Sequence, residues 1–154
     1  MRRLLLPAAA VLALALAGCG SDSGSSGAQQ STWPGPPKPR ADGTVAFADF
    51  NAYLAEDGQA FAGSPTAAVT EFLGLDDSSA SVTTMRATSP GEVRNFSEVV
   101  TTLEGLLDDS VKASRYTVEL QQNDAKQWRL RAAEWAQSCQ AGRGHQDFSP
   151  EPCV

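Results

Sequence analysis

The sequence predicts an α+β domain in which short helices precede an antiparallel sheet. Apolar residues recur at helical spacing through residues 47–73, whereas from about residue 80 apolar and polar residues alternate with a period of two. The chain has 154 residues, which leaves room for a single domain. We therefore expect two short helices packed on one face of a three- or four-stranded antiparallel meander.

The first helix is expected in FADFNAYLAEDG, where Phe47 and Leu54 share an apolar stripe and Gly58 can end the helix. The second helix has clearer signals, because Ser64 can act as N-cap and Pro65 suits the first helical position. Its apolar stripe consists of Ala68, Val69, Phe72 and Leu73, and Gly74 follows. Both helices are short and marginal alone, so each should pack on the sheet.

Four segments are expected to be strands, because they are rich in Val, Thr, Tyr and Trp and are separated by turn residues. They are residues 81–87, 96–103, 112–120 and 127–135. In the last segment, Trp128, Leu130 and Ala132 alternate with Arg129 and Arg131. One face is then apolar and the other charged, as in an antiparallel sheet with one solvated side. The connections LLDDS and NDAK are short enough for hairpins, and their aspartates suit turns.

The first 19 residues, MRRLLLPAAAVLALALAGC, have the pattern of an export signal. Arg2 and Arg3 precede an apolar run of 13 residues at 4–16, too short for the roughly 20 residues that span a bilayer core. The sequence LAGC at residues 16–19 resembles the bacterial lipobox. This resemblance implies a lipoprotein that is cleaved before Cys19, acylated there, and tethered to the extracytoplasmic face of the cell membrane. The alternative is an ordinary cleaved signal peptide with a chance cysteine.

A linker and one globular domain should follow the signal peptide at residues 1–18. Residues 19–42 are dominated by Gly, Ser, Gln and Pro, and this composition predicts a disordered tether that ends in a stiffer segment, WPGPPKP. Trp33 falls within this linker and is expected to be solvated. Residues 43–154 are then the single α+β domain.

The charge of the chain bears on its partners. Without residues 1–18 the chain has 10 basic and 18 acidic residues, a formal net charge of −8. Such a domain lacks the basic patch needed to neutralise phosphates, so nucleic acid is not an expected partner. Charge would not attract it to an anionic membrane either. Membrane lipid is expected to be reached through the acylated Cys19.

The second half of the chain carries two resemblances. The runs GLLDDSVKASRYTVEL and WRLRAAEWAQSCQAGRGHQDFSPEPC, within residues 105–153, are similar to small bacterial lipoproteins and secreted proteins with no known activity. This similarity implies a real domain without implying a chemistry. The order of two helices followed by a curved sheet also resembles the cystatin-like or nuclear-transport-factor-2-like layout. Such folds host many unrelated functions.

Residues 139–153, near the end of the domain, gather several reactive side chains. Cys139 and Cys153 flank the run QAGRGHQDFSPEP in a chain expected to be exported, and Cys19 is assigned to lipid. Two remaining cysteines in an oxidising compartment favour a disulfide, which we expect here. The alternative is a metal site that includes His145. It would need reduced thiols, and the spacing matches no common zinc pattern.

The polar residues of this loop allow a functional and a structural interpretation. Arg143, His145 and Asp147 could form a binding loop that grips an anion or a carboxylate. We favour the alternative, in which the loop folds back on the sheet with Phe148 packed and His145 hydrogen-bonded to the backbone. With Ser149 the loop holds the residue types of a hydrolase triad, but a triad is defined by spatial geometry and seldom arises from neighbours in one loop. We therefore predict no catalytic residue, metal ligand or cofactor.

Three classes of function remain after this reading. The leading one is a non-catalytic binding or interaction module that faces an envelope protein or a small ligand. A small pocket enzyme would need converging acid and base groups, and most charged residues here are expected on solvated strand faces. A structural accessory to another membrane protein would be favoured by an exposed apolar patch, to which Leu106 and Leu107 could contribute unless they pack under a helix.

Overall fold

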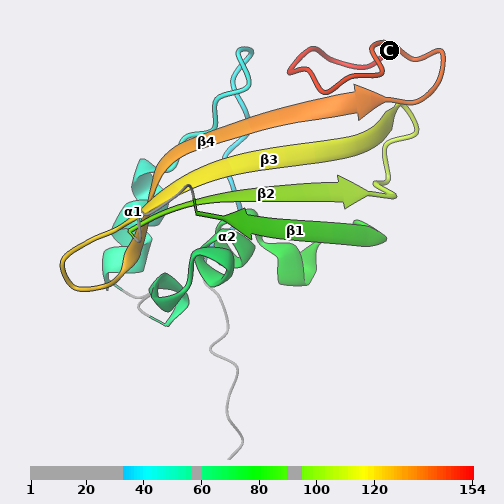
Figure 1. The fold of residues 1–154 in the computed structure, drawn as a ribbon. Coiled ribbons are helices and arrows are strands. Elements are labelled where there is room, and N and C mark those ends of the chain that lie inside the picture. The colour runs from blue at the N-terminus through cyan, green and yellow to red at the C-terminus, as the bar shows by residue number, and fades with distance from the viewer. Residues whose placement is uncertain (1–32, 57–59, 90–94) are drawn as a thin grey trace, which may run out of the picture. The chain divides into compact units, whose positions relative to one another are not determined.

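The computed structural model describes residues 33–56, 60–89 and 95–154, and every element below belongs to the unit Ser31–Val154 (Figure 1). The α-helices are α1 (Ala48–Glu56) and α2 (Pro65–Leu73), with 3₁₀ turns at Phe61–Gly63 and Leu75–Asp77. The strands are β1 (Val82–Thr88), β2 (Phe96–Glu104), β3 (Val111–Gln122) and β4 (Trp128–Cys139). The predicted lipobox, most of the linker and Gly58 lie outside the described residues.

The four strands form one antiparallel sheet in the order β1-β2-β3-β4, and the two α-helices lie against one face of it (Figure 1). This confirms the α+β class with four strands. Strand pairs align core residues directly opposite one another, as for Val99, Val118 and Ala133, which are all buried. One face of the sheet is therefore the floor of the core, as the alternating pattern predicts.

The helices contribute two fully buried aromatic residues to the core. Phe50 and Leu54 of α1 and Phe72 of α2 are fully buried, and the ring centroids of the two phenylalanines are 5.1 Å apart. At the start of α2, Ser64 occupies the N-cap position, but its side chain makes no capping hydrogen bond and instead lies 3.0 Å from the Thr66 hydroxyl. The location predicted for this helix start is right and the capping interaction is wrong.

Trp33 is part of this core, which contradicts the expectation of a solvated side chain. Its ring lies edge-on to Phe50, with the centroids 5.0 Å apart, and its indole Nε1 donates a hydrogen bond to the Phe72 carbonyl at 3.0 Å. Because a buried indole N–H needs an acceptor, this bond fixes the ring at one place on α2. The packed region thus begins upstream of residue 43, within the proline-rich segment that was assigned to the linker.

A β-bulge interrupts the alternation of β4. Ala132 pairs with Glu119, while Leu130 pairs with Leu120, which leaves Arg131 as an extra residue in β4. The side-chain pattern shifts by one position at this point, so that Ala133 is buried where the strict alternation predicted Ala132. A bulge of this kind bends the strand and redirects the extra side chain.

The outer edge of β4 is covered from its first half onward. The side-chain amide of Asn51 donates to the Leu130 carbonyl at 2.8 Å and accepts from the Leu130 N–H at 3.0 Å. The Val45 N–H donates to the Ala133 carbonyl at 2.9 Å. The start of the domain and α1 are therefore docked onto the strand by backbone hydrogen bonds of that strand.

Farther along the same edge, the Trp135 N–H donates to the Gly43 carbonyl at 2.7 Å. Gly43 has φ of +85°, and a Cβ there would lie 2.7 Å from the Trp135 carbonyl oxygen, so only glycine fits this approach. Gln137 and Ser149 then exchange two backbone hydrogen bonds of 2.9 Å. Segments from both ends of the domain thus occupy one edge of the sheet.

Candidate functional site

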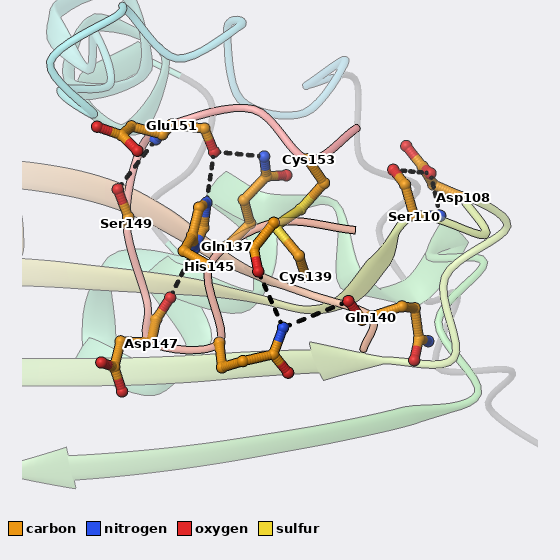
Figure 2. Close-up of a disulfide and its surroundings, with 12 residues drawn as sticks. Asp108, Ser110, Gln137, Cys139, Gln140, His145, Asp147, Ser149, Glu151 and Cys153 are labelled. Atoms are coloured by element: carbon orange, nitrogen blue, oxygen red, sulfur yellow. Dashed lines mark hydrogen bonds between the residues drawn. A yellow bond between two sulfur atoms is a disulfide. The ribbon is translucent and has the colours of Figure 1, made fainter. Parts of the chain in front are cut away.

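The C-terminal loop, residues 140–154, contains the residues that the sequence singled out, and a disulfide closes it (Figure 2). Cys139 at the end of β4 is bonded to Cys153, with Cα atoms 5.5 Å apart, which confirms the predicted pairing. Gly144 has φ of +131°, and a Cβ on it would lie 3.0 Å from the Cys139 sulfur. The glycine thus lets the loop pass close over the disulfide.

His145 is held between two backbone carbonyls of the same loop. Its Nδ1 lies 2.8 Å from the Asp147 carbonyl oxygen and its Nε2 lies 2.9 Å from the Glu151 carbonyl oxygen (Figure 2). A neutral imidazole has one N–H and could donate to only one of them, whereas an imidazolium donates to both. The hydrogen bonds to Glu151 and then Asp147, helped by the carboxylates of both residues, therefore raise the pKa of His145 above its ordinary value.

The same loop is paired with β4 by its backbone. The Cys139 N–H donates to the His145 carbonyl at 2.9 Å, and the Gln137 side-chain amide donates to the Glu151 carbonyl at 2.8 Å. The Glu151 carbonyl oxygen therefore accepts a hydrogen bond from Gln137 and also lies 2.9 Å from Nε2 of His145. The histidine, the strand and the tail are joined at this oxygen, as the structural interpretation of the loop predicts.

Arg143 and Phe148 make contacts outside the loop. The Arg143 guanidinium forms an ion pair with Asp109 of the β2–β3 turn, at 3.1 Å between Nη2 and Oδ2, and both side chains are well exposed. Phe148 is half-buried, and the guanidinium of Arg115 on β3 lies 4.0 Å from the centre of its ring. The predicted apolar packing of Phe148 is thus a cation–π contact with the sheet face opposite to the helices.

The loop does not bring its polar residues together as a catalytic set. Asp147 is exposed and engages His145 through its backbone carbonyl, and the Ser149 hydroxyl accepts a hydrogen bond from the Glu151 N–H at 3.2 Å. Both imidazole nitrogens face carbonyl oxygens, so neither is available as a base toward Ser149. A triad needs a nucleophile–base hydrogen bond, and this arrangement directs the imidazole elsewhere.

The residue types of a soft metal site do gather here. One ligand atom each from Cys139, His145 and Cys153 lies within 4.8 Å of the other two. The two sulfurs are joined to each other, however, and a metal is bound by thiolates rather than by a disulfide. In this oxidised state the donor set does not fit a metal ion.

The turn that precedes β3 has the features predicted for its aspartates. Asp108 Oδ1 accepts hydrogen bonds from the N–H and hydroxyl of Ser110, at 2.9 and 2.7 Å, and these bonds lower the pKa of the Asp108 carboxyl. Next to them, Leu107 is 88% exposed, whereas Leu106 is partly buried. A single exposed leucine is ordinary on a protein surface, so the pair does not form a contact patch.

A second region, which sequence reasoning missed, lies where the start of the domain crosses β4. A pocket of about 380 Å³ opens between residues 44–48 and residues 131–134, with Arg40 also in its lining. We call it the arginine pocket after Arg40 and Arg131. The sequence places Arg131 on a solvated strand face, and it predicts neither the bulge at this residue nor the pairing of Val45 with Ala133 beside it.

The described part of the chain contains no helix long and apolar enough to cross a membrane. Its most reactive side chains form a closed structural loop. Hollows with a pair of arginines in their lining include the arginine pocket and one of about 470 Å³, which Arg131 lines together with Arg129. Comparison of the chain with known protein families, with curated proteins and with solved structures found no match.

Proposed function

We propose that this chain is a bacterial lipoprotein, held at the extracytoplasmic face of the cell membrane by lipid on Cys19. The observation that carries the proposal is LAGC at residues 16–19, which follows two arginines and an apolar run of 13 residues. Two acyl chains give a stable anchor, because each buried methylene contributes about 0.8 kcal/mol and one chain alone is marginal. Residues 20–32 would then form a short tether between the lipid and Trp33.

We further propose that the domain is a non-catalytic binding or interaction module of the cystatin-like or nuclear-transport-factor-2-like class. Two helices on one face of a four-stranded antiparallel meander support this assignment. The space beneath the helices is filled by Phe50, Phe72 and Trp33, so a ligand or an envelope protein would have to bind at the surface. The engagement of His145 by two carbonyls supports a module without catalysis.

Metabolic labelling with an alkyne analogue of palmitate tests the anchor. We expect the wild-type protein to be labelled and to sediment with membranes, and a Cys19→Ala variant to lose the label. Cys153→Ser is the matched control, because it removes a cysteine and leaves the lipobox intact. A Cys19→Ala variant that is still labelled and remains in the membrane fraction would contradict the proposal.

Chemical cross-linking in native membranes, followed by purification of the labelled protein, tests the binding module. A partner or small molecule recovered in constant ratio and chemically unchanged is the expected result. Recovery of a converted product that accumulates with time would instead point to an enzyme.

A further inference from the structure

We propose that the arginine pocket binds a small amphipathic anion, a single carboxylate attached to an apolar body. The inference rests on the proposed function in one respect, since it gives the binding module its class of ligand. It is carried by the shape and lining of the pocket, the positions of its two arginines and the nature of the groups around them.

The walls of the pocket are fixed by hydrogen bonds. The Val45 N–H donates to the Ala133 carbonyl at 2.9 Å, and Thr44 forms a β-bridge with Glu134. The turn before them is also closed, because the Arg40 N–H donates to the Thr44 carbonyl at 2.9 Å. A volume of about 380 Å³ lies within the range of small-molecule sites, and a pocket with hydrogen-bonded walls needs little ordering on binding.

Apart from the two arginines, the lining of the pocket is mostly apolar. It comes from Val45, Phe47 and Ala48 on one side and from Ala132 and Ala133 on the other. Phe47 and Val45 also belong to the hydrophobic core or pack against it, so this surface is backed by the body of the domain. An occupant would gain by covering it with hydrocarbon.

The two guanidinium groups have donors to spare. Arg131 Nη1 donates to Gln121 Oε1 at 3.0 Å, and Arg40 Nη1 lies 3.4 Å from the Thr44 hydroxyl. Within the described residues neither arginine forms an ion pair. Each guanidinium carries five N–H donors, so most of them remain for a ligand. Nearby, the Asp42 carboxylate accepts from the N–H and hydroxyl of Thr44, at 2.9 and 2.7 Å, and these bonds lower its pKa.

Two carboxylates of the protein, Glu134 and Asp42, limit the charge of the ligand. Glu134 also lines the pocket and is exposed. With Asp42 beside Arg40, the two arginines are matched by two carboxylates, so the surroundings of the pocket are neutral overall and disfavour a phosphate dianion more than a single carboxylate. Arginine binds carboxylates through paired N–H donors, and this geometry suits the head of the ligand while its hydrocarbon covers the alanines.

Photo-crosslinking with a diazirine derivative of octanoate tests the inference on the full mature chain in phosphatidylcholine nanodiscs. We expect labelled peptides from residues 44–48 and 131–134, and competition by free octanoate but not by octylammonium. Arg131→Gln and Arg40→Gln should each reduce labelling several-fold. Arg86→Gln is the matched control, because Arg86 is exposed on β1, at the opposite border of the sheet, and should label like the wild type.

Ala132→Leu tests the hydrocarbon part, since the larger side chain should fill the pocket and lower labelling while both arginines remain. Equal competition by octanol and octanoate would overturn the inference, as would labelling elsewhere or labelling unchanged by both arginine variants. The anchor is tested separately. A chain that lacks lipid yet is labelled in the pocket would overturn the lipoprotein proposal alone, and a lipidated chain without labelling would overturn the pocket alone.

Discussion

The C-terminal loop and the arginine pocket use their polar groups in opposite ways. In the loop, both ring nitrogens of His145 lie against carbonyl oxygens, Gln137 donates to one of the same carbonyls, and the sulfurs of the two cysteines are bonded to each other. In the pocket, Arg40 and Arg131 each donate one hydrogen bond to a side chain, and both belong to a lining that is otherwise mostly apolar. The loop is saturated internally, and the pocket has donors left for a ligand.

The difference shows that a density of reactive residue types does not by itself indicate a site. Histidine, cysteine, aspartate and serine within one short run attract attention because each has catalytic uses. In this domain they form hydrogen bonds and a disulfide within a loop that has no helix or sheet of its own. A group engaged in such a bond is not available for catalysis. The hydrogen-bonding capacity that remains unused is the better indicator, and it depends on tertiary structure.

The largest effect should follow from opening the disulfide. Replacing Cys139 and Cys153 by alanine should lower the free energy of unfolding by about 3 kcal/mol, because the chain-entropy model assigns roughly that value to a closed loop of this length. Thermal and urea unfolding measure the loss. Labelling of the arginine pocket should persist at a temperature well below the melting point. An unchanged melting temperature would mean that the closed loop does not stabilise the domain. The structural role assigned to the loop would then be wrong.

Removing the ring of Phe148 should have the second largest effect on stability. Because the ring is half-buried, Phe148→Ala should cost about 1.5 kcal/mol, roughly half of the value for a fully buried phenylalanine. Loss of the cation–π contact with Arg115 is part of that cost. Phe148→Leu is a matched control that keeps apolar volume and removes the aromatic face. A melting temperature equal to that of the wild type would show that the loop does not depend on this contact.

The protonation of His145 should change the stability of the domain by a smaller amount. The pKa of His145 is raised in the folded protein, so its stabilising contribution is fully present below the unfolded pKa and is lost as pH rises through the folded pKa. Thermal unfolding across neutral pH should show this loss in the wild type but not in His145→Gln. Titration of the imidazole by NMR gives the pKa directly.

Two variants separate the causes of that pKa. Asp147→Asn and Glu151→Gln remove the nearby carboxylates and keep both backbone carbonyls. Since hydrogen bonding to the carbonyls of Glu151 and Asp147 is the main cause, the pKa of His145 should remain raised in both variants. A return of the pKa to the ordinary histidine value in these variants would show that the carboxylate charges cause the shift. It would contradict the assignment of the shift to the two backbone carbonyls.

The smallest change in stability should come from Arg143→Gln. The ion pair with Asp109 is exposed, and such pairs contribute less than about 1 kcal/mol. Melting curves should differ little between this variant and Asp109→Asn. An Arg143→Gln protein could instead melt normally and no longer retain the partner captured by the wild type. The loop would then be a binding site, contrary to the structural role assigned to it.

Local patterns in the sequence predicted much of this fold. The four strands and both helices follow from periodicity, and the glycine and proline signals around residues 65–74 placed α2. The bulge at Arg131 could not be predicted, because its neighbours alternate regularly in the sequence. In the structure, Asn51 of α1 is hydrogen-bonded to the adjacent Leu130, and this contact between distant residues leaves no local signal. The docking of Trp33 was also hidden, since a proline-rich composition predicts a spacer and gives no sign of an acceptor on α2.

The disulfide could be predicted from the expected compartment and the number of cysteines. For His145, the sequence predicted hydrogen bonding to the backbone but not which carbonyls take part. Two carbonyls within reach of one imidazole depend on how residues 145–151 curve, and no spacing rule encodes that. The arginine pocket was missed for a similar reason. Residues 40 and 131 are distant in sequence, and they flank one hollow only because the start of the domain pairs with the last strand.

The covered edge of β4 also decides how copies of this domain can associate. The sheet has β1 at its other border, and in the described residues that strand is paired with β2 alone. A further strand can therefore be added on one side only. Two copies that met along β1 would occupy both open borders and leave none for a third, so growth by strand addition ends at a closed pair and cannot continue into a filament.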